Sequence, residues 1–297
     1  MVDDPGEPTV LACVLHWGDP GLTSRCVASL VSQQPHISVL VVANDDAWTS
    51  ESAAGVDVLA TRRNLGYAGG MNAGLRWAMA RGYDYIALIT NDGWFQDTSA
   101  IDALVTTVKG DERMAACGPK LVRKRRSGEA IEWTLGSEEY PHDAPKGSVV
   151  RPTGLADSIK DVGWVGGSCM VLRVGAIREV GLLDEDLFMY SEEVDWCFRA
   201  LLAGWYLCRN EEVVFFEEAS ASASTVTGLK DYYMTRNRLA ISKRYEGRIE
   251  LAIATLKASR VAIGLARRGD HRWKWVASGV VDFYRNRMGA NPDLHHV

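Results

Sequence analysis

The 297-residue chain lacks the features that define several protein classes. Its six cysteines are scattered and form no CxxC pair, which argues against a zinc site or a disulfide framework. No apolar run approaches the roughly 18 residues that cross a bilayer. The stretch 1–8 is acidic and contains proline, unlike a secretory signal peptide. These absences predict a cytoplasmic globular protein with reduced cysteines in its core.

The chain also lacks a nucleic-acid recognition motif and carries a net charge of -5. We therefore expect no nucleic-acid partner. The charge is distributed unevenly, because residues 230–297 hold 14 Lys/Arg against 6 Asp/Glu, whereas residues 1–229 hold 19 against 32. The C-terminal part is thus a chemically distinct, basic segment.

Short apolar runs alternate with amphipathic patterns along the first part of the chain. We expect strands over 10–15, 37–43, 56–60, 83–90 and 162–173, and helices over 20–33, 68–81 and 192–203. This alternation predicts βαβ units and a mainly parallel sheet, whose ligands bind beyond the carboxyl ends of the strands. Residues 123–161 have weak periodicity and are expected to form a long excursion. Helical patterns follow residue 225 and continue to about residue 288.

Polar residues follow three of the expected strands. These segments are Asn44-Asp45-Asp46, the glycine-rich stretch 64–74, and Asn91-Asp92-Gly93. Glycines at a helix start allow close backbone approach to a ligand, and exposed N–H groups favour phosphate. The spacing is not GxGxxG, which disfavours a standard dinucleotide fold. Asp92 suits a hard divalent cation on a diphosphate. Taken alone, each segment also fits an ordinary turn or tight helix–sheet packing.

The segment Asp184–Arg199 is the most informative of the chain. Its acidic residues are interspersed with apolar residues, and partly buried acids are typical of general bases and metal ligands. Its acids are Asp184, Glu185, Asp186, Glu192, Glu193 and Asp195. The alternative is that Glu192 and Glu193 simply favour a helix N-terminus.

Five motifs occur in order along the chain. They are N-x-G-x-A-G-x-x-N-x-G from Asn64, a strand ending T-N-D at Asp92, G-G-S-C-M-V-L-R from Gly166, the acidic segment, and Y-Y-M-T-R-N-R from Tyr232. Together they resemble the family 2 inverting glycosyltransferases with the GT-A fold, particularly the rhamnosyltransferase-like branch. The resemblance covers roughly residues 10–238.

This resemblance implies an α/β GT-A domain over 1–228, with a mainly parallel central sheet that binds a nucleotide sugar, and a basic helical segment over 229–297. The implied donor-binding residues are Asn44, Asp45, Asn64, Gly66, Asn72, Asn91 and Arg236, the last beside the departing diphosphate. Asp92 is implied to hold Mg²⁺ or Mn²⁺. Glu192, Glu193 and Asp195 match the family's E-D-x-D, whose aspartate is the general base that takes the acceptor proton.

The chain departs from the family pattern at two positions. Glu193 stands where the family has the aspartate base, so either the pocket is reshaped or Asp195 is the base. Glu217 stands where the family has a histidine after a late strand, and its oxygens suit Mg²⁺ or Mn²⁺. The alternative is weakened metal use. These departures keep open a second hypothesis, a catalytically weak homologue that binds a nucleotide sugar or a partner.

The resemblance also implies partners. The donor is a nucleoside-diphosphate sugar, with rhamnose on dTDP or UDP as the leading interpretation. The acceptor is a saccharide, a lipid-linked saccharide or a small molecule, and an oligomer is compatible with the sequence. The basic segment also contains Trp273, Trp275, Phe283 and Tyr284. It either packs its aromatic side chains on the core or makes a peripheral contact with an anionic membrane.

Overall fold

The computed structural model describes residues 9–45, 48, 55–124, 130–132, 145, 158–218 and 228–294. Most of the excursion expected over 123–161 lies outside these residues. The described strands form one mixed sheet. They are β1 Val10–His16, β2 Ser38–Ala43, β3 Asp57–Ala60, β4 Tyr85–Thr90, β5 Gly93–Phe95, β6 Met114–Lys124, β7 Ala130–Glu132, β8 Ile159–Asp161, β9 Cys169–Arg173 and β10 Tyr206–Glu218.

The strand order is β3-β2-β1-β4-β9-β6-β10-β5, with β7 beside β6 and β8 beside β10. The neighbours β3, β2, β1 and β4 run parallel, and β6 runs parallel to β10. Strand β9 lies antiparallel between β4 and β6. The buried apolar runs of β1, β2 and β4 fit parallel strands that are covered on both faces. The expected α/β fold is confirmed.

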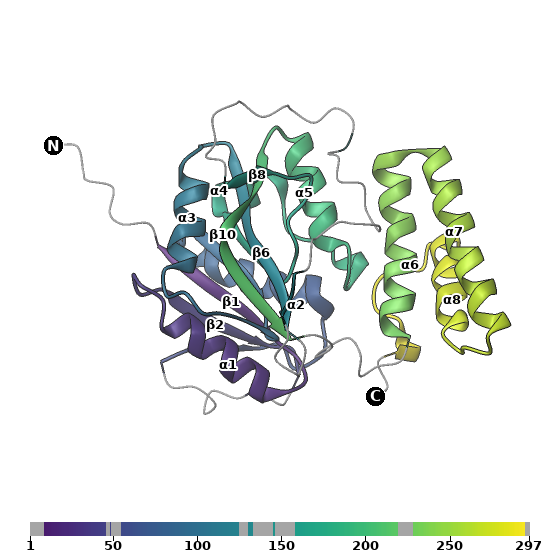
Figure 1. Cartoon of the computed structure of the whole chain (residues 1–297), viewed down its shortest axis with the longest axis horizontal. Coiled ribbons are helices and arrows are strands. Elements are labelled where there is room, and N and C mark those ends of the chain that lie inside the picture. The colour runs from purple at the N-terminus through teal and green to yellow at the C-terminus, as the bar shows by residue number, and fades with distance from the viewer. Residues whose placement is uncertain are drawn as a thin grey trace.

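Helices cover both faces of the sheet (Figure 1). Helices α1 Pro20–Val31 and α3 Ala100–Lys109 pack on one face, where Val14 and Val41 belong to their core. Helices α2 Gly66–Ala80, α4 Val174–Val180 and α5 Glu192–Leu202 cover the other face. Alternate residues of each buried strand therefore supply two separate cores.

The glycines of α2 explain how closely this helix approaches the sheet. A Cβ at Gly74 would lie 2.2 Å from Cys13 Sγ, and a Cβ at Gly70 would lie 2.4 Å from Leu15 Cδ1. Both positions therefore require glycine for helix–sheet packing. Gly66 differs, because its φ is +70° and a Cβ there would lie 2.3 Å from the Phe188 carbonyl oxygen. It brings the start of α2 against the acidic segment.

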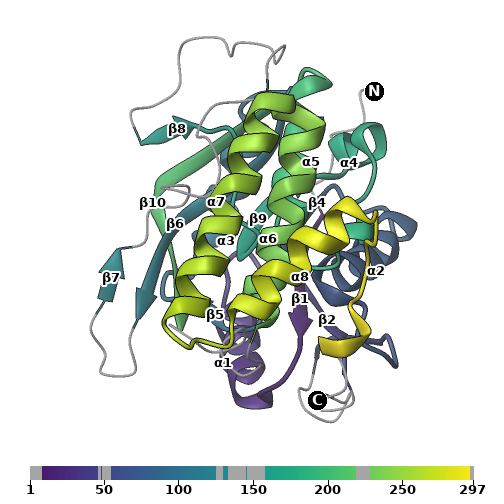
Figure 2. The same ribbon diagram turned by 90° about the vertical axis from the view of Figure 1, so that its right-hand side faces the viewer.

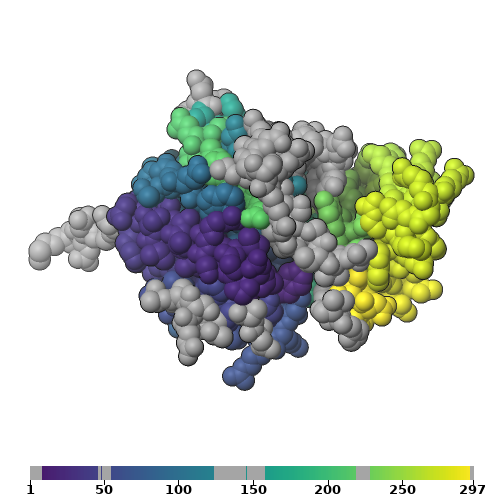
Figure 3. All heavy atoms as spheres, turned by 60° about the horizontal axis from the view of Figure 1, so that its bottom comes forward, coloured from purple at the N-terminus to yellow at the C-terminus, as the bar shows by residue number. Residues whose placement is uncertain are grey.

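Three long helices follow the sheet: α6 Leu229–Ile241, α7 Arg248–Arg267 and α8 Trp273–Tyr284. Figures 1 and 2 show α6 nearest the sheet, with α7 and α8 outside it. In the space-filling view these helices form one end of the molecule, opposite the N-terminal elements (Figure 3). No helix in the described ranges is long and apolar enough to cross a membrane.

Candidate active site

The candidate site begins where three parallel strands end. His16 ends β1 and pairs in register with Ala43 of β2, while the neighbouring Leu15 pairs with Thr90 of β4. The residues that follow β2 and β4 are therefore brought to the same edge of the sheet as His16. These residues are Asn44, Asp45, Asn91 and Asp92. The sequence predicted this edge but missed His16, although a polar residue ending a buried strand was a usable signal.

His16 lies in a buried polar network. Its Nδ1 is 2.6 Å from Thr23 Oγ1, and its Nε2 is 3.1 Å from Asp45 Oδ1. Asn91 Nδ2 donates to the same Thr23 hydroxyl at 2.9 Å. Burial lowers the pKa of His16, and Asp45 offsets only part of that effect. At neutral pH His16 is therefore an uncharged imidazole that lies beside the Asp45 carboxylate.

Asn44 is buried and its amide is committed to the local turn. Its Oδ1 accepts from the backbone N–H of Leu65 at 2.9 Å, and its Nδ2 donates to Asn64 Oδ1 at 3.1 Å and to the Gly66 carbonyl at 3.2 Å. The amide of Asn44 therefore shapes the loop, and its implied contact with a nucleotide base stays a prediction. Asn64 is exposed beside it and stays a candidate for donor contact.

Asn72 makes all of its side-chain hydrogen bonds inside the described protein. It is fully buried, and its Oδ1 accepts from Leu183 N at 3.0 Å. Its Nδ2 donates to the Leu183 carbonyl and to Glu185 Oε1, both at 2.9 Å. The side chain of Asn72 therefore fastens α2 to the acidic segment, and its contact with a nucleotide stays a prediction.

Asp92 and Glu217 come together at the end of the sheet. Glu217 pairs with Gly93 between β10 and β5, and Glu218 N donates to the Asp92 carbonyl at 3.0 Å. Burial raises the pKa of Glu217, and the charge of Asp92 raises it further. Arg123 Nε lies 3.6 Å from Glu217 Oε2. Two carboxylates with one nearby guanidinium thus face the same small volume.

Asp92 and Glu217 have the oxygen ligands that a divalent cation requires. Within the described ranges, no group of three or more His, Cys, Asp or Glu side chains forms a complete cation site. Mg²⁺, however, is usually held by one or two carboxylates together with substrate phosphates. The buried Glu217 and the half-buried Asp92, whose charges repel each other, satisfy that requirement. Asp92 and Glu217 therefore fit a cation that is shared with a diphosphate.

The acidic residues at the start of α5 follow a strained turn. Phe188, Tyr190 and Ser191 have φ values of 64°, 65° and 76°, in the left-handed region that side chains rarely adopt. Such strain is tolerated where surrounding contacts hold it, and it is common at functional sites. The turn delivers Glu192 and Glu193 to the first positions of α5.

Glu192 and Glu193 occupy different environments. Glu192 is buried, and within the described chain its Oε2 has no hydrogen-bond partner. Burial raises the pKa of Glu192 well above its usual value, and the charge of Glu193 adds to this. Glu193 is half-buried beside Gly167, where a Cβ would lie 3.5 Å from Glu193 Cγ. Glu193 therefore presents the more accessible carboxylate.

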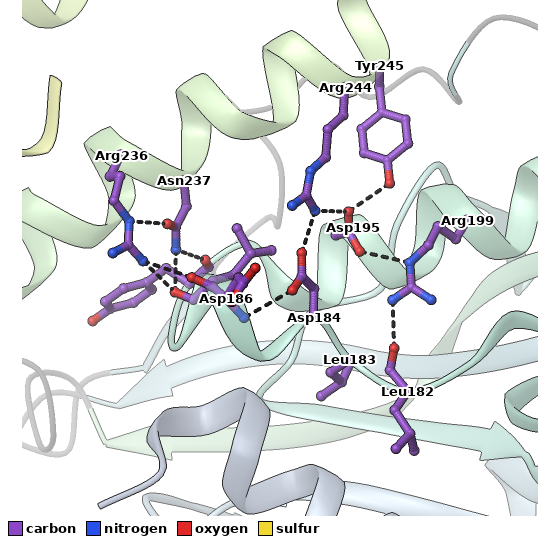
Figure 4. A network of polar contacts seen from close by, with 12 residues as sticks. Leu182, Leu183, Asp184, Asp186, Asp195, Arg199, Arg236, Asn237, Arg244 and Tyr245 are labelled. Atoms are coloured by element: carbon purple, nitrogen blue, oxygen red, sulfur yellow. Dashed lines mark hydrogen bonds and ion pairs between the residues drawn. The ribbon is translucent and has the colours of Figure 1, made fainter. Parts of the chain in front are cut away.

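Asp195 is buried, with 1% of its surface exposed, and both of its oxygens are engaged (Figure 4). Its Oδ1 accepts from Arg244 Nη1 at 2.8 Å and from the Tyr245 hydroxyl at 2.7 Å. Its Oδ2 accepts from Arg199 Nε at 2.8 Å. The alternative in which Asp195 is the base is therefore disfavoured, because three donors hold its carboxylate inside the protein.

Arg236 also forms its hydrogen bonds inside the described protein. It is buried, and its guanidinium donates to the Gly289 carbonyl at 2.7 Å and to the Leu187 carbonyl at 3.0 Å (Figure 4). Asn237 donates to the carbonyls of Leu187, Met189 and Tyr190. Both side chains therefore anchor the strained turn to α6, and the contact of Arg236 with the diphosphate stays a prediction.

A separate cavity of about 210 Å³ opens between β6, β8 and the loop before β9. Lys160, Trp164 and Arg209 contribute to its wall. Val165 and Gly166 form one wall of the cavity. Gly167 follows them in the chain, and a Cβ at this position would lie 3.5 Å from Glu193 Cγ. The cavity therefore adjoins the accessible carboxylate through a single short loop.

Comparisons with known proteins identify the family of this chain. Residues 20–177 match the family described as glycosyl transferase family 2. The chain is 30% identical over 205 residues to the N-acetylglucosaminyl-diphospho-decaprenol L-rhamnosyltransferase of Mycobacterium tuberculosis, covering 60% of this chain and 64% of the relative. It is 28% identical over 144 residues to the low-salt glycan biosynthesis hexosyltransferase Agl10 of Haloferax volcanii, covering 46% and 43%. The chain thus spans less than two-thirds of either relative.

Two solved structures share the fold. GalNAc-T7 with UDP, GalNAc and Mn²⁺ superposes with a TM-score of 0.64 at 14% identity, covering 96% of this chain and 59% of that one. The mannosyltransferase PcManGT of Pyrobaculum calidifontis, with GDP-Man and Mn²⁺, gives 0.56 at 12% identity, covering 94% and 88%. At these identities the likeness concerns the fold, and it confirms the expected GT-A architecture.

Proposed function

This chain belongs to glycosyltransferase family 2, and from that premise we propose that it transfers a sugar from a nucleoside-diphosphate donor to an acceptor hydroxyl with inversion. The observation that supports this most directly is the arrangement of acids at one sheet edge. Asp92 and Glu217 meet beyond the strand ends, and a strained turn delivers Glu193 to the start of α5. Asp92 and Glu217 can bind a cation on the donor diphosphate, and the Glu193 carboxylate can accept the proton of the acceptor hydroxyl.

The donor is proposed to lie over the ends of β1, β2 and β4. Asp45, which lies beside His16, and the exposed Asn64 are the candidates for contact with the nucleoside. Asn91 is held by Thr23 and by the Trp17 carbonyl, so its proposed role is to fix the shape of this pocket. The two solved structures of similar fold contain UDP or GDP-Man, which supports a nucleotide-sugar ligand for this fold.

Asp92 and Glu217 are proposed to hold Mg²⁺ or Mn²⁺ against the diphosphate. When bound, such a cation offsets the charge that develops on the leaving nucleoside diphosphate. Since Arg236 is buried, Arg123 is the residue we propose for a direct contact with the departing diphosphate. Its guanidinium already lies 3.6 Å from the Glu217 carboxylate. A fixed positive charge at this position stabilises the transition state without reorganisation.

Glu193 is proposed as the general base. A sugar hydroxyl is a poor nucleophile, and a carboxylate within hydrogen-bond reach removes its proton as the new bond forms. Asp195 is engaged by three donors, whereas Glu193 is half-buried against the side-chain-free Gly167. Attack from the face opposite the diphosphate inverts the anomeric carbon, and no covalent enzyme intermediate is needed.

The donor sugar and the acceptor are proposed at the level of class. The similarity to a rhamnosyltransferase favours a deoxysugar such as rhamnose on dTDP or UDP. That relative is named for a diphospho-decaprenol acceptor, which supports a lipid-linked saccharide here, with soluble saccharides and small molecules as further candidates. The cavity lined by Trp164 is the proposed acceptor side of the site.

Calorimetry and turnover together test this proposal. UDP, dTDP and GDP are titrated into the protein with and without Mn²⁺, and transfer is assayed over a panel of sugar donors and acceptors. The proposal expects one nucleotide to bind more tightly with Mn²⁺ and the matching donor to turn over. Tight nucleotide binding without turnover of any donor would favour the second candidate, a non-catalytic homologue, which the glutamates at 193 and 217 keep under consideration.

A further inference from the structure

Helix α7 carries an exposed apolar stripe on the outside of the molecule. Ile249, Ile253, Leu256 and Ile263 recur at intervals of four, three and seven residues, which places them on one face of the helix. Their exposed fractions are 76%, 40%, 60% and 51%. Soluble proteins seldom leave a continuous apolar row of this kind in water, so such a row indicates a contact surface. We call these four residues the α7 stripe.

The opposite face of α7 explains how the helix is held. Leu251, Ala254 and Leu265 lie on that side, and Leu265 is buried. Helix α7 packs there against α8 and α6. The stripe therefore points away from α6 and α8, and Figure 2 shows α7 itself in the outermost layer of the molecule. One face of α7 thus packs against other helices of the protein, and the face that carries the stripe is exposed to solvent.

Basic residues run along and beside the stripe. Arg260 and Arg267 continue its spacing, and Arg248, Lys257 and Arg268 flank it. The single acid of the helix is Glu250. In the part of the chain that the structure describes, Lys257, Arg260 and Arg267 form no ion pair, unlike Arg272, which contacts Asp270 at 2.8 Å. These cations are available to an external anionic partner.

We propose that the α7 stripe and its flanking cations dock the protein on the surface of an anionic membrane. The helix would lie in the plane of the interface, with the aliphatic side chains among the acyl chains and the Lys and Arg at the headgroups. A helix of 20 residues extends about 30 Å along this surface. Contact with a second copy of the chain is less suited to this face, because two basic faces repel each other.

Charge across the whole molecule supports the same orientation. Residues 1–229 carry 32 Asp/Glu against 19 Lys/Arg, whereas residues 230–297 carry 6 against 14. An anionic surface therefore attracts the C-terminal end and repels the remainder. The end that bears α7 lies opposite the N-terminal elements in Figure 3, so the molecule approaches with one end foremost.

Sedimentation of the intact chain with vesicles tests this proposal. Vesicles of phosphatidylcholine alone and with about one-third phosphatidylglycerol are compared at low and high salt. We expect binding to the anionic vesicles, weakened by salt because the attraction is screened. The variant Lys257→Glu/Arg260→Glu should lower the binding constant by a factor on the order of ten or more. Ile249→Ser/Leu256→Ser should also lower it, since the inserted side chains are lost.

Matched control variants separate this surface from general effects. Lys109→Glu/Arg178→Glu makes the same charge change at exposed positions of α3 and α4, and Val31→Ser/Leu202→Ser removes exposed apolar groups from α1 and α5. Both controls should bind vesicles as the unchanged protein does. Absence of vesicle binding at low salt, or equal loss in variants and controls, overturns the proposal. So does a dimer in sedimentation velocity that Ile249→Ser/Leu256→Ser abolishes while no vesicle binding is seen.

Discussion

The acids of the segment Asp184–Arg199 divide according to their partners. Asp184 accepts from the Asp186 N–H at 3.0 Å and forms an ion pair with Arg244, so it shapes the turn. Asp195 binds three donors from α5 and the C-terminal segment. Glu192 is buried beside Glu193 without comparable compensation. Adjacent acids of similar chemistry thus have structural and proposed catalytic roles that differ with burial.

The first prediction concerns Glu192 and pH. The unfolded chain ionises this carboxyl near 4.5, whereas burial raises its pKa well above that value in the folded protein. The folded state therefore retains the proton to higher pH, and the free energy of unfolding decreases as pH rises above 4.5. Glu192→Gln removes this penalty and should raise the melting temperature at pH 7 by a few degrees.

Thermal unfolding of both proteins across pH 4 to 8 checks the Glu192 prediction. The gain in melting temperature should shrink toward zero as pH falls below about 4.5, where both chains are uncharged at this position. Glu212→Gln, at an exposed position of β10, is the matched control and should show no such trend. A gain that stays constant with pH would contradict the buried-carboxylate explanation.

The second prediction concerns the carboxylate pair. Asp92→Asn and Glu217→Gln should each weaken Mn²⁺-dependent binding of the nucleoside diphosphate by about tenfold or more, as loss of an oxygen ligand does. Metal-independent binding should change little. Because the pKa of Glu217 is raised, the Mn²⁺ enhancement should also decline as pH falls toward the acid range. Calorimetry with and without Mn²⁺ checks this, and an unchanged enhancement in both variants would contradict it.

At the scale of single residues, sequence motifs predicted where residues gather better than what each one does. Asp92 and Glu217, predicted to hold a metal, lie close enough for the charge of Asp92 to raise the pKa of Glu217. Asn44, Asn72 and Arg236 were predicted to bind the donor, and in the structure each forms hydrogen bonds with the backbone and with neighbouring side chains. A motif cannot distinguish a residue that binds a ligand from one that anchors the backbone, because both roles require the same hydrogen-bond donors and acceptors. Burial decides between them.

At the scale of elements, the strained turn is held from both sides. Gly66 at the start of α2 packs under Phe188, and Ala68 N donates to the Phe188 carbonyl at 3.1 Å. From the other side, Arg236 and Asn237 of α6 donate to carbonyls of the same turn. The position of Glu193 therefore depends on α2 and α6 as well as on α5.

The third prediction tests this anchoring by α6. Arg236→Met removes the side-chain donor to the Gly289 carbonyl and one of the donors to the Leu187 carbonyl, and it should lower the free energy of unfolding by roughly 2–4 kcal/mol. The exposed Arg178→Met is the control and should change stability by less than about 0.5 kcal/mol. Chemical denaturation measures both. An Arg236→Met protein of unchanged stability that has lost turnover would instead support a role at the diphosphate.

The helices and strands predicted from the sequence are those whose apolar residues follow a regular pattern of burial. β1, β2, β4, α1, α2 and α5 all appear within a few residues of their expected bounds. Residues 162–168 were expected to be strand but lie before β9, because Gly163, Gly166 and Gly167 interrupt the pattern. The segments that became α3, β6 and β10 were not identified. The strand β10 is irregular, with a register shift between Asn210 and Val214 that breaks its alternation.

At the scale of the whole molecule, the C-terminal helices are part of the site's support. Tyr232 and Tyr233 of α6 are buried, and Tyr233 stacks on Phe188 with ring centroids 5.3 Å apart. Arg244 and Tyr245 close on Asp195. The division into residues 1–228 and 229–297 follows composition and secondary structure, and we propose that the second part is required to hold the first in its working form.

The fourth prediction follows from that dependence. A chain that ends at Gly228 would expose Phe188 and remove Arg244 and Tyr245, two of the three donors to the Asp195 carboxylate. Breaking such a buried pair costs roughly 3–5 kcal/mol, a large fraction of the stability of most domains. The shortened chain should therefore aggregate or melt well below the intact protein. Melting at the temperature of the intact chain would show that residues 1–228 fold independently.

The most direct test of the central claim is single-turnover transfer by Glu193→Gln, measured together with the dissociation constant of the donor nucleotide. The account predicts unchanged nucleotide binding and a rate lower by roughly 10²–10⁴, the usual contribution of a general base. Glu193→Asp keeps a carboxylate and should retain measurable transfer. A Glu193→Gln protein that turns over at the original rate would contradict the assignment of Glu193 as the base.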